Sequence, residues 1–219
     1  MELLSRTVGP VGTNVYVLAD SRTHEAIAID TATPSVVWLS GLLEERGWKL
    51  KLIVSTHGHW DHIGDNEAVR AWTHDHQAGD EAGIAVHPLD REMLVHPQPL
   101  FAPFPIPPSV PAVELAEGGR VKFGEIDLEV LHTPGHTEGS VCLLDRASGL
   151  LLAGDTLFAG SWGRTDLPGG SDEQMAASLT RLAGLDDGLR VLPGHGPATT
   201  IEAERAWLEW VRAHGTLPR

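Results

Sequence analysis

Three histidines and an aspartate occupy four positions within six residues: His57, His59, Asp61 and His62. The residue frequencies of the chain would produce this pattern by chance about 0.002 times in a sequence of this length, which disfavours the alternative of a polar loop with solvated histidines. In an extended segment, residues two apart project to the same side, so His57 and His59 can bind one ion together. Asp61 and His62 then turn toward a neighbouring position as the chain enters a helix. Imidazole and carboxylate ligands, without thiolates, indicate zinc, iron or manganese.

Three more residues stand in glycine-containing turns that follow apolar, strand-like segments. They are His136 in Thr-Pro-Gly-His-Thr, Asp155 in Gly-Asp-Thr, and His195 in Pro-Gly-His-Gly-Pro. Glycine allows the backbone to bring a ligand close to a crowded centre. A single histidine or aspartate in such a turn is usually no more than part of the turn. Together with the first cluster, these three residues predict a metal centre.

The elements that position these residues follow from the apolar patterns of the chain. Short apolar or alternating segments predict strands, and amphipathic segments predict helices. The predicted strands are 14–18, 25–30, 50–55, 83–86, 120–123, 126–131, 141–144, 150–153 and 190–192. The predicted helices are 34–46, 63–72, 172–182 and 201–212. Gly47 is expected to end the first helix, and Ser171 or Asp172 to cap the third.

Two segments are predicted to lack regular structure. Residues 73–82 are polar and acidic, and we expect an exposed loop there. Residues 96–111 contain seven of the fifteen prolines, and proline disfavours helix interiors and central strands. We expect this second segment to be an ordered loop that borders the substrate pocket or a subunit contact.

A weak internal repeat suggests how these elements assemble. In each half, an apolar strand leads into an Asp-Thr pair, at Asp30 and at Asp155, and a helix and a short strand ending near a histidine follow. Chance repetition of a common α/β pattern is the alternative. A structural repeat would give an α/β fold in which two β-rich halves pack together and helices cover the outside. This arrangement is a four-layer αββα sandwich, with the site where the strand ends of both halves meet.

With these histidines and aspartates in place, the sequence resembles the metallo-β-lactamase superfamily over about residues 14–200. The signature His-x-His-x-Asp-His, followed by a separate His, an Asp and a final His, is matched without gaps. The resemblance implies the αββα sandwich of the metallo-β-lactamase type, which we expect to form a single domain over residues 1–219. It also implies two divalent metal ions, for which zinc is our first expectation, with iron or manganese as alternatives. Two such ions lower the pKa of a shared water to give hydroxide near neutral pH, and they polarise a carbonyl group.

The resemblance also implies a role for each residue. His57, His59 and His136 would bind the first ion, Asp61, His62 and His195 the second, and Asp155 would bridge the two. We expect Asp61 to be catalytic as well as a ligand. The other histidines are expected to be ordinary packed or solvated residues, and Asp30 has no ligand role in the superfamily pattern.

Within the superfamily, three features resemble the small glyoxalase II-like hydrolases: Trp60 in the first motif, the loop 160–170 and the segment 194–200. The resemblance implies hydrolysis of a thioester such as S-lactoylglutathione or a related acyl thioester. Arg164 is a candidate contact for a substrate carboxylate, and a structural ion pair with Asp166 is the alternative. Full-length glyoxalase II carries a helical domain that binds glutathione, whereas this chain has only the helix 201–212 at that place. An iron-dependent persulfide dioxygenase and a lactonase of the same fold are the alternative activities.

The overall composition limits the partners of the chain. It has 16 Lys+Arg against 30 Asp+Glu, a formal net charge of −14, so we expect a small-molecule substrate, no nucleic acid and no membrane. The absence of a signal-peptide pattern and of a long apolar span leads us to expect a cytoplasmic protein. One cysteine excludes an intramolecular disulfide and any cysteine-based zinc cluster.

Overall fold

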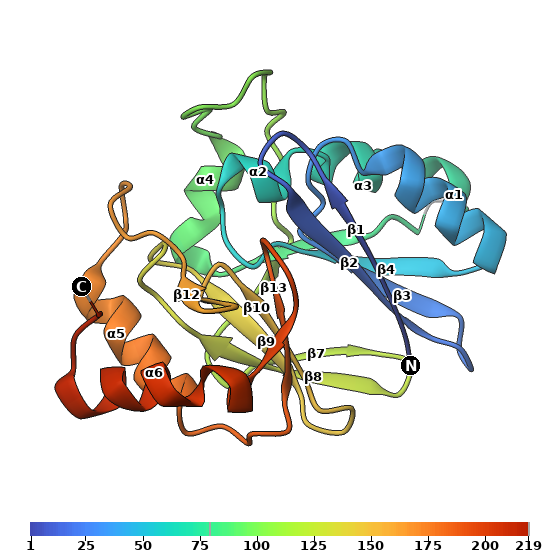
Figure 1. The fold of residues 1–219 in the computed structure, drawn as a ribbon. Helices are drawn as coiled ribbons and strands as arrows, with labels where there is room; N and C mark the ends of the chain where they lie inside the picture. The colour runs from blue at the N-terminus through green and yellow to red at the C-terminus, as the bar shows by residue number, and fades with distance from the viewer. Residues whose placement is uncertain (79, 219) are drawn as a thin grey trace.

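The computed structural model describes residues 1–78 and 80–218. Within this range the strands form two six-stranded sheets and a separate hairpin (Figure 1). Sheet 1 has the spatial order β1-β2-β3-β4-β5-β6, with strands β1 (Glu2–Val8), β2 (Thr13–Asp20), β3 (Glu25–Ile29), β4 (Lys49–Val54), β5 (Gly83–Val86) and β6 (Val113–Glu114). Sheet 2 has the order β14-β13-β10-β9-β8-β7, with strands β7 (Arg120–Phe123), β8 (Ile126–His132), β9 (Val141–Asp145), β10 (Leu150–Gly154), β13 (Arg190–Pro193) and β14 (Thr199–Thr200). The hairpin consists of β11 (Leu157–Phe158) and β12 (Ser161–Trp162).

Helices cover the outer face of each sheet (Figure 1). They are α1 (Val36–Arg46), α2 (Trp60–Ile63), α3 (Asn66–His76), α4 (Arg91–Val95), α5 (Asp172–Leu182) and α6 (Ile201–His214), with a 3-10 turn η1 (Pro88–Asp90). Local signals set two of these boundaries as predicted. Gly47 ends α1 in the left-handed conformation, at φ 63°, and the Ser171 hydroxyl caps α5 by accepting a hydrogen bond from Gln174 N.

The alternation of side chains along β2 explains why the layers stack. Val15 and Val17 pack into the core that includes residues of α1 and α3, whereas Tyr16 and Leu18 pack into the core shared with sheet 2. Successive side chains of a strand point to opposite faces, so β2, buried along its whole length, supplies both cores. A third core lies between sheet 2 and the helices α5 and α6. Three cores separate four layers, and the predicted αββα sandwich is confirmed.

The weak repeat in the sequence corresponds to a repeated topology. β2 pairs antiparallel with β3, which pairs parallel with β4 after the crossover through α1. β9 pairs antiparallel with β10, which pairs parallel with β13 after the crossover through α5. The two Asp-Thr pairs therefore follow equivalent strands, β3 and β10, in the two sheets.

The structure corrects several predicted boundaries. The predicted helix 63–72 is two helices, α2 and α3, separated at Gly64, where a side chain would collide with Thr33. The prediction of an exposed loop over 73–82 is wrong in its first part, because α3 continues to His76 and Thr73 is buried. Residue 79 lies outside the described residues. β1 was not predicted, because this half-exposed edge strand lacks a regular apolar alternation.

The proline-rich segment is a loop, as predicted: residues 96–112 form neither helix nor strand. It follows α4 and lies beside α2 on the sheet 1 side of the molecule (Figure 1). Among the described residues, no helix has the length and apolar character needed to cross a membrane.

Candidate metal centre

The carboxyl ends of four strands bring the predicted ligands together. β4 leads into His57 and His59, β8 into His136, β10 into Asp155, and β13 into His195. β8 and β10 both run antiparallel to β9, and β13 runs parallel to β10, so these three strands end at the same edge of sheet 2. The two sheets are joined there by backbone hydrogen bonds, of which one runs from the backbone N–H of residue 14 to the carbonyl of residue 194, at 2.7 Å.

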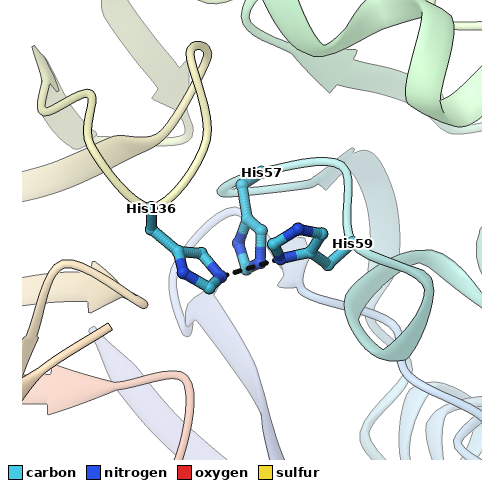
Figure 2. A group of neighbouring side chains, drawn as sticks. All are labelled: His57, His59 and His136. Carbon is cyan, nitrogen blue, oxygen red and sulfur yellow. Dashed lines mark hydrogen bonds between the residues drawn. The ribbon is translucent and has the colours of Figure 1, made fainter. Parts of the chain in front are cut away.

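His57, His59 and His136 form a first group, in which one ring nitrogen of each residue lies within 4.8 Å of the others. Figure 2 shows the three rings converging, two from the loop after β4 and one from the loop after β8. The closest pair of atoms is His59 Nδ1 and His136 Nε2, at 2.7 Å. The sequence prediction that His57 and His59 project to one side agrees with this arrangement.

Asp61, His62 and His195 form a second group within the same 4.8 Å limit. His62 Nε2 lies 3.2 Å from His195 Nε2, and Asp61 Oδ2 lies 3.2 Å from the same His195 nitrogen. Asp155 stands between the two groups: its carboxylate oxygens lie 3.4 Å from His136 Nε2 and 3.5 Å from the Nε2 atoms of both His62 and His195. The structure thus brings together all seven predicted residues, with Asp155 in the position expected of a bridging carboxylate.

Hydrogen bonds on the outer side of two rings fix which nitrogen faces the centre. His136 Nδ1 donates to the carbonyl of Arg164 at 2.7 Å, so its Nε2 lone pair is directed at the first group. His62 Nδ1 donates to Asp30 Oδ2 at 3.0 Å, so its Nε2 is directed at the second. Such outer partners set the tautomer and orientation of metal-binding histidines. Asp30 is itself held by Thr56, whose backbone N–H and hydroxyl both donate to it at 2.8 Å.

The two groups differ in their electrostatics. Burial, reinforced by neighbouring histidines, holds the pKa of His57 well below its usual range and lowers the pKa of His59 to about 3. These two rings are therefore neutral, which is the form that binds metals. Burial also lowers the pKa of His62, but the carboxylates of Asp155, Asp61 and Asp30 outweigh it and raise that pKa to about 10. The three carboxylates around His62 thus stabilise positive charge at this side of the cluster.

Two further observations show that these residues could bind a pair of cations. Among the described residues, four buried side-chain N or O atoms have no hydrogen-bond partner, and two of them face this cluster: His57 Nε2 and Asp155 Oδ1. Buried polar atoms without partners are costly unless something binds them. Two ligands at about 2.0–2.1 Å from a tetrahedral zinc are about 3.3–3.4 Å apart, close to the spacings of 3.2–3.5 Å in the second group. Imidazole and carboxylate donors suit zinc, iron and manganese alike.

Asp90, a buried residue of η1 with no role in the sequence prediction, connects the two loops of the first group. Its carboxylate accepts hydrogen bonds from Gly58 N (2.8 Å) and from Gly139 N and Thr137 Oγ1 (both 2.7 Å). The approach is so close that a side chain at Gly139 would collide with the carboxylate. Burial raises the pKa of Asp90, although these three donors oppose the shift. Asp90 therefore ties the loop of His57 and His59 to the loop that carries His136.

Two side chains of β2 hold the His195 loop, and sequence reasoning missed them as well. Asn14 Nδ2 donates to the carbonyls of Pro193 (3.0 Å) and Gly196 (2.9 Å), and the Tyr16 hydroxyl donates to Pro193 at 2.8 Å. Burial is the main reason that the pKa of Tyr16 is raised, so its hydroxyl keeps the proton that it donates. The partners of Asn14 lie 179 and 182 residues away along the chain, so no local sequence pattern predicts these hydrogen bonds. For Asp30 a signal existed, because it is the repeat counterpart of Asp155.

A cavity of about 680 Å³ opens onto the centre, and its floor includes His59, Asp61, His136, Asp155 and His195. A volume of this size suits a small molecule. The proline-rich loop borders the cavity through Leu100, Phe101 and Pro103. Arg164 also lines it, but both ends of its guanidinium fork already bind Asp166, at 2.7 and 2.8 Å. The ion pair with Asp166 is therefore present, and contact of Arg164 with a substrate carboxylate stays a prediction.

Sequence comparison finds a matching family model and similar proteins. The model of a family described as "Metallo-beta-lactamase superfamily" matches residues 8–195. An uncharacterized protein of Aquifex aeolicus is 37% identical over 206 residues, covering 91% of this chain and 92% of its own. A protein of Thermosynechococcus vestitus named hydroxyacylglutathione hydrolase is 34% identical over 202 residues, covering 89% of this chain and 71% of its own.

Solved structures agree with the sequence comparison. The B3 metallo-beta-lactamase BLEG-1 superposes with a TM-score of 0.85 at 30% identity, covering 96% of this chain and 99% of its own. TTHA1623, solved in a di-iron-bound form, gives a TM-score of 0.78 at 35% identity, covering 92% and 96%. ETHE1 from Myxococcus xanthus gives 0.78 at 28% identity, covering 97% and 85%. The similar proteins thus include differently named members with one common fold.

Proposed function

The chain belongs to the metallo-beta-lactamase superfamily, and we propose that it is a metal-dependent hydrolase that cleaves acyl thioesters. The observation that carries the proposal is the convergence of five histidines and two aspartates on one end of the cavity. The similarity to a protein named hydroxyacylglutathione hydrolase supports a thioester, such as S-lactoylglutathione or a related acyl thioester, as the substrate. The cavity volume supports a small-molecule substrate.

In this proposal the residues of the first group would hold one divalent ion and those of the second group another, with Asp155 between them. Bound divalent ions acidify water and polarise a carbonyl oxygen, which are the two requirements of acyl hydrolysis near neutral pH. Zinc is our first choice, and the di-iron form of TTHA1623 makes iron the main alternative.

Groups of the protein itself would orient the metal-binding rings and the attacking water. Asp30 and the Arg164 carbonyl orient His62 and His136, so these rings do not have to reorganise during the reaction. Asp61 lines the cavity, and we assign its carboxylate a second role in orienting the attacking water by accepting a hydrogen bond.

The test combines metal analysis of the purified protein with activity on a thioester, a lactone and a persulfide. We expect about two bound ions per chain and hydrolysis of the thioester. His59→Ala removes a nitrogen of the first group and should lower kcat/KM at least 1000-fold while the circular dichroism spectrum stays that of a folded protein. His74→Ala changes an exposed histidine on α3 and should have no effect.

Thioesterase activity that survives in metal-replete His59→Ala protein would contradict the mechanism. Oxygen uptake with the persulfide, one iron per chain and no thioester hydrolysis would replace the proposal by the dioxygenase alternative. Hydrolysis confined to the lactone would replace it by the lactonase alternative.

A further inference from the structure

The cavity beside the metal centre has an apolar side, which we call the apolar wall: Val11, Leu100, Phe101, Phe158, Trp162 and Leu167. These residues come from three separate segments, which are the β1–β2 turn, the proline-rich loop, and the β11–β12 hairpin with the loop that follows it. Segments so far apart in the sequence line one cavity only because the fold brings them together beside the site.

Part of the apolar wall is open to solvent. The exposed fractions of Val11, Leu100 and Phe101 are 51%, 36% and 79%, which place them among the large hydrophobic residues on the surface. A scattered exposed apolar residue needs no explanation, but a contiguous set beside a polar site is typical of a binding surface. The solvent-exposed part of the cavity lining therefore includes large apolar side chains.

The charged groups that line the cavity also favour an apolar, uncharged substrate. Among the described residues, Arg164 is the one lysine or arginine that lines it, and its guanidinium already binds Asp166. The glutathione part of a thioester carries two carboxylates and one ammonium group. Burying carboxylates without cationic partners is unfavourable, so this cavity offers little to bind glutathione, whereas an alkyl chain would be accommodated.

We propose that the substrate is a thioester with an apolar, uncharged acyl chain that packs against the apolar wall while its carbonyl faces the histidine cluster. This inference rests on the proposed hydrolase function and deepens it by naming the substrate class. Removing apolar surface from water drives such binding, and each fully buried methylene contributes about a threefold to fourfold gain in affinity.

The experiment compares four thioesters with the metal-loaded protein: the acetyl, butanoyl and hexanoyl thioesters of N-acetylcysteamine, and S-lactoylglutathione. We expect kcat/KM to rise at least tenfold from acetyl to hexanoyl, and the hexanoyl compound to exceed S-lactoylglutathione. Phe101→Ala and Val11→Ala should each reduce the hexanoyl-to-acetyl ratio, Phe101→Ala about fivefold. Val37→Ala is the matched control, because Val37 is an equally apolar, exposed residue on α1 outside the cavity, and it should leave the ratio unchanged.

A binding measurement separates this inference from the proposed activity. By calorimetry, the non-hydrolysable S-hexyl-N-acetylcysteamine should bind at least tenfold more tightly than the S-methyl compound, and Phe101→Ala should reduce that difference. If thioesters are not hydrolysed but the chain-length effect on binding is present, the proposed activity fails and the apolar site stands. If chain length affects neither binding nor kcat/KM, or if S-lactoylglutathione is the best substrate, the apolar-substrate inference is overturned.

Discussion

His87 is a buried histidine at the end of β5, outside the candidate metal centre. Its ring stacks on His132 of β8, with centroids 4.1 Å apart and planes 7° from parallel. Its Nδ1 accepts a hydrogen bond from Leu89 N at 3.3 Å, so this nitrogen carries no proton. Burial and, to a smaller extent, the neighbouring His132 lower the pKa of His87 to about 4. No sequence pattern separates His87 from the other unassigned histidines, because its stacking partner is 45 positions away.

This histidine makes the folded protein sensitive to mild acid. The folded-state pKa of about 4 lies below the unfolded value of 6.5, so the unfolded chain takes up the proton first and the stability that neutral His87 contributes is lost as the pH falls from about 6.5 toward 4. His87→Asn keeps an acceptor for Leu89 N but does not titrate. Between pH 7 and pH 4.5 we expect the free energy of unfolding of the wild type to fall by about 1–2 kcal/mol more than that of the variant. Urea unfolding of metal-free protein measures the difference, and parallel pH profiles would refute it.

Of the candidate centre, the seven residues that the structure brings together could be proposed from local patterns. Four follow from the spacing of histidines and an aspartate after β4, and three from a glycine that precedes a histidine or aspartate after β8, β10 and β13. Of the residues that orient them, Asp30 had only a weak signal, as the repeat counterpart of Asp155, and Asp90 had none. Asp30 and Asp90 act through partners 26 to 49 positions away, and a buried carboxylate that accepts backbone hydrogen bonds looks like any surface aspartate in a sequence.

At the scale of elements, the turn η1 contributes to the candidate centre because it carries Asp90. Its three hydrogen bonds hold together the loops that carry His57, His59 and His136. An asparagine has one acceptor oxygen in place of two, and its amide would face a backbone N–H. We expect Asp90→Asn to weaken binding of the first ion about tenfold to 100-fold, measured by competition with a chromophoric chelator.

Asp20 provides a matched control for this loop connection. It is also buried, and its carboxylate accepts backbone hydrogen bonds from Arg22 and from Glu125 at the end of β2 opposite the centre. Asp20→Asn should destabilise the fold without changing metal affinity. Equal metal affinities for Asp90→Asn and Asp20→Asn would show that Asp90 acts on general stability and not on the centre.

The regular elements were predictable where the sequence has a compact apolar run, as in β4 and β10, or a periodic apolar pattern, as in β8, α5 and α6. The hairpin of β11 and β12 was not, because two-residue strands leave no period to detect. Its position depends on tertiary contacts, among them the packing of Trp162 against Trp207 of α6, with ring centroids 5.6 Å apart. This hairpin supplies part of the apolar wall, so the substrate side of the cavity was less predictable than the metal side.

At the scale of the whole molecule, the centre lies where two halves of repeated topology meet. His57, His59, Asp61 and His62 follow a strand of sheet 1, whereas His136, Asp155 and His195 follow strands of sheet 2. Each ion group draws on both sheets. An ion in either group would therefore connect the halves, in addition to the apolar core between the sheets.

Removing the metal should consequently destabilise the entire fold. Ligands that bind only the folded state add about 4 kcal/mol to stability when their concentration is 1000 times Kd, and for a chain of this size 1 kcal/mol shifts Tm by about 2–4 °C. We expect dialysis against a strong chelator to lower Tm by about 10 °C, and added zinc to restore it. The His59→Ala variant has an incomplete first group, so chelation should lower its Tm by less than it lowers that of the wild type. An unchanged Tm after complete metal removal, verified by elemental analysis, would mean that the core between the sheets alone holds the two halves together.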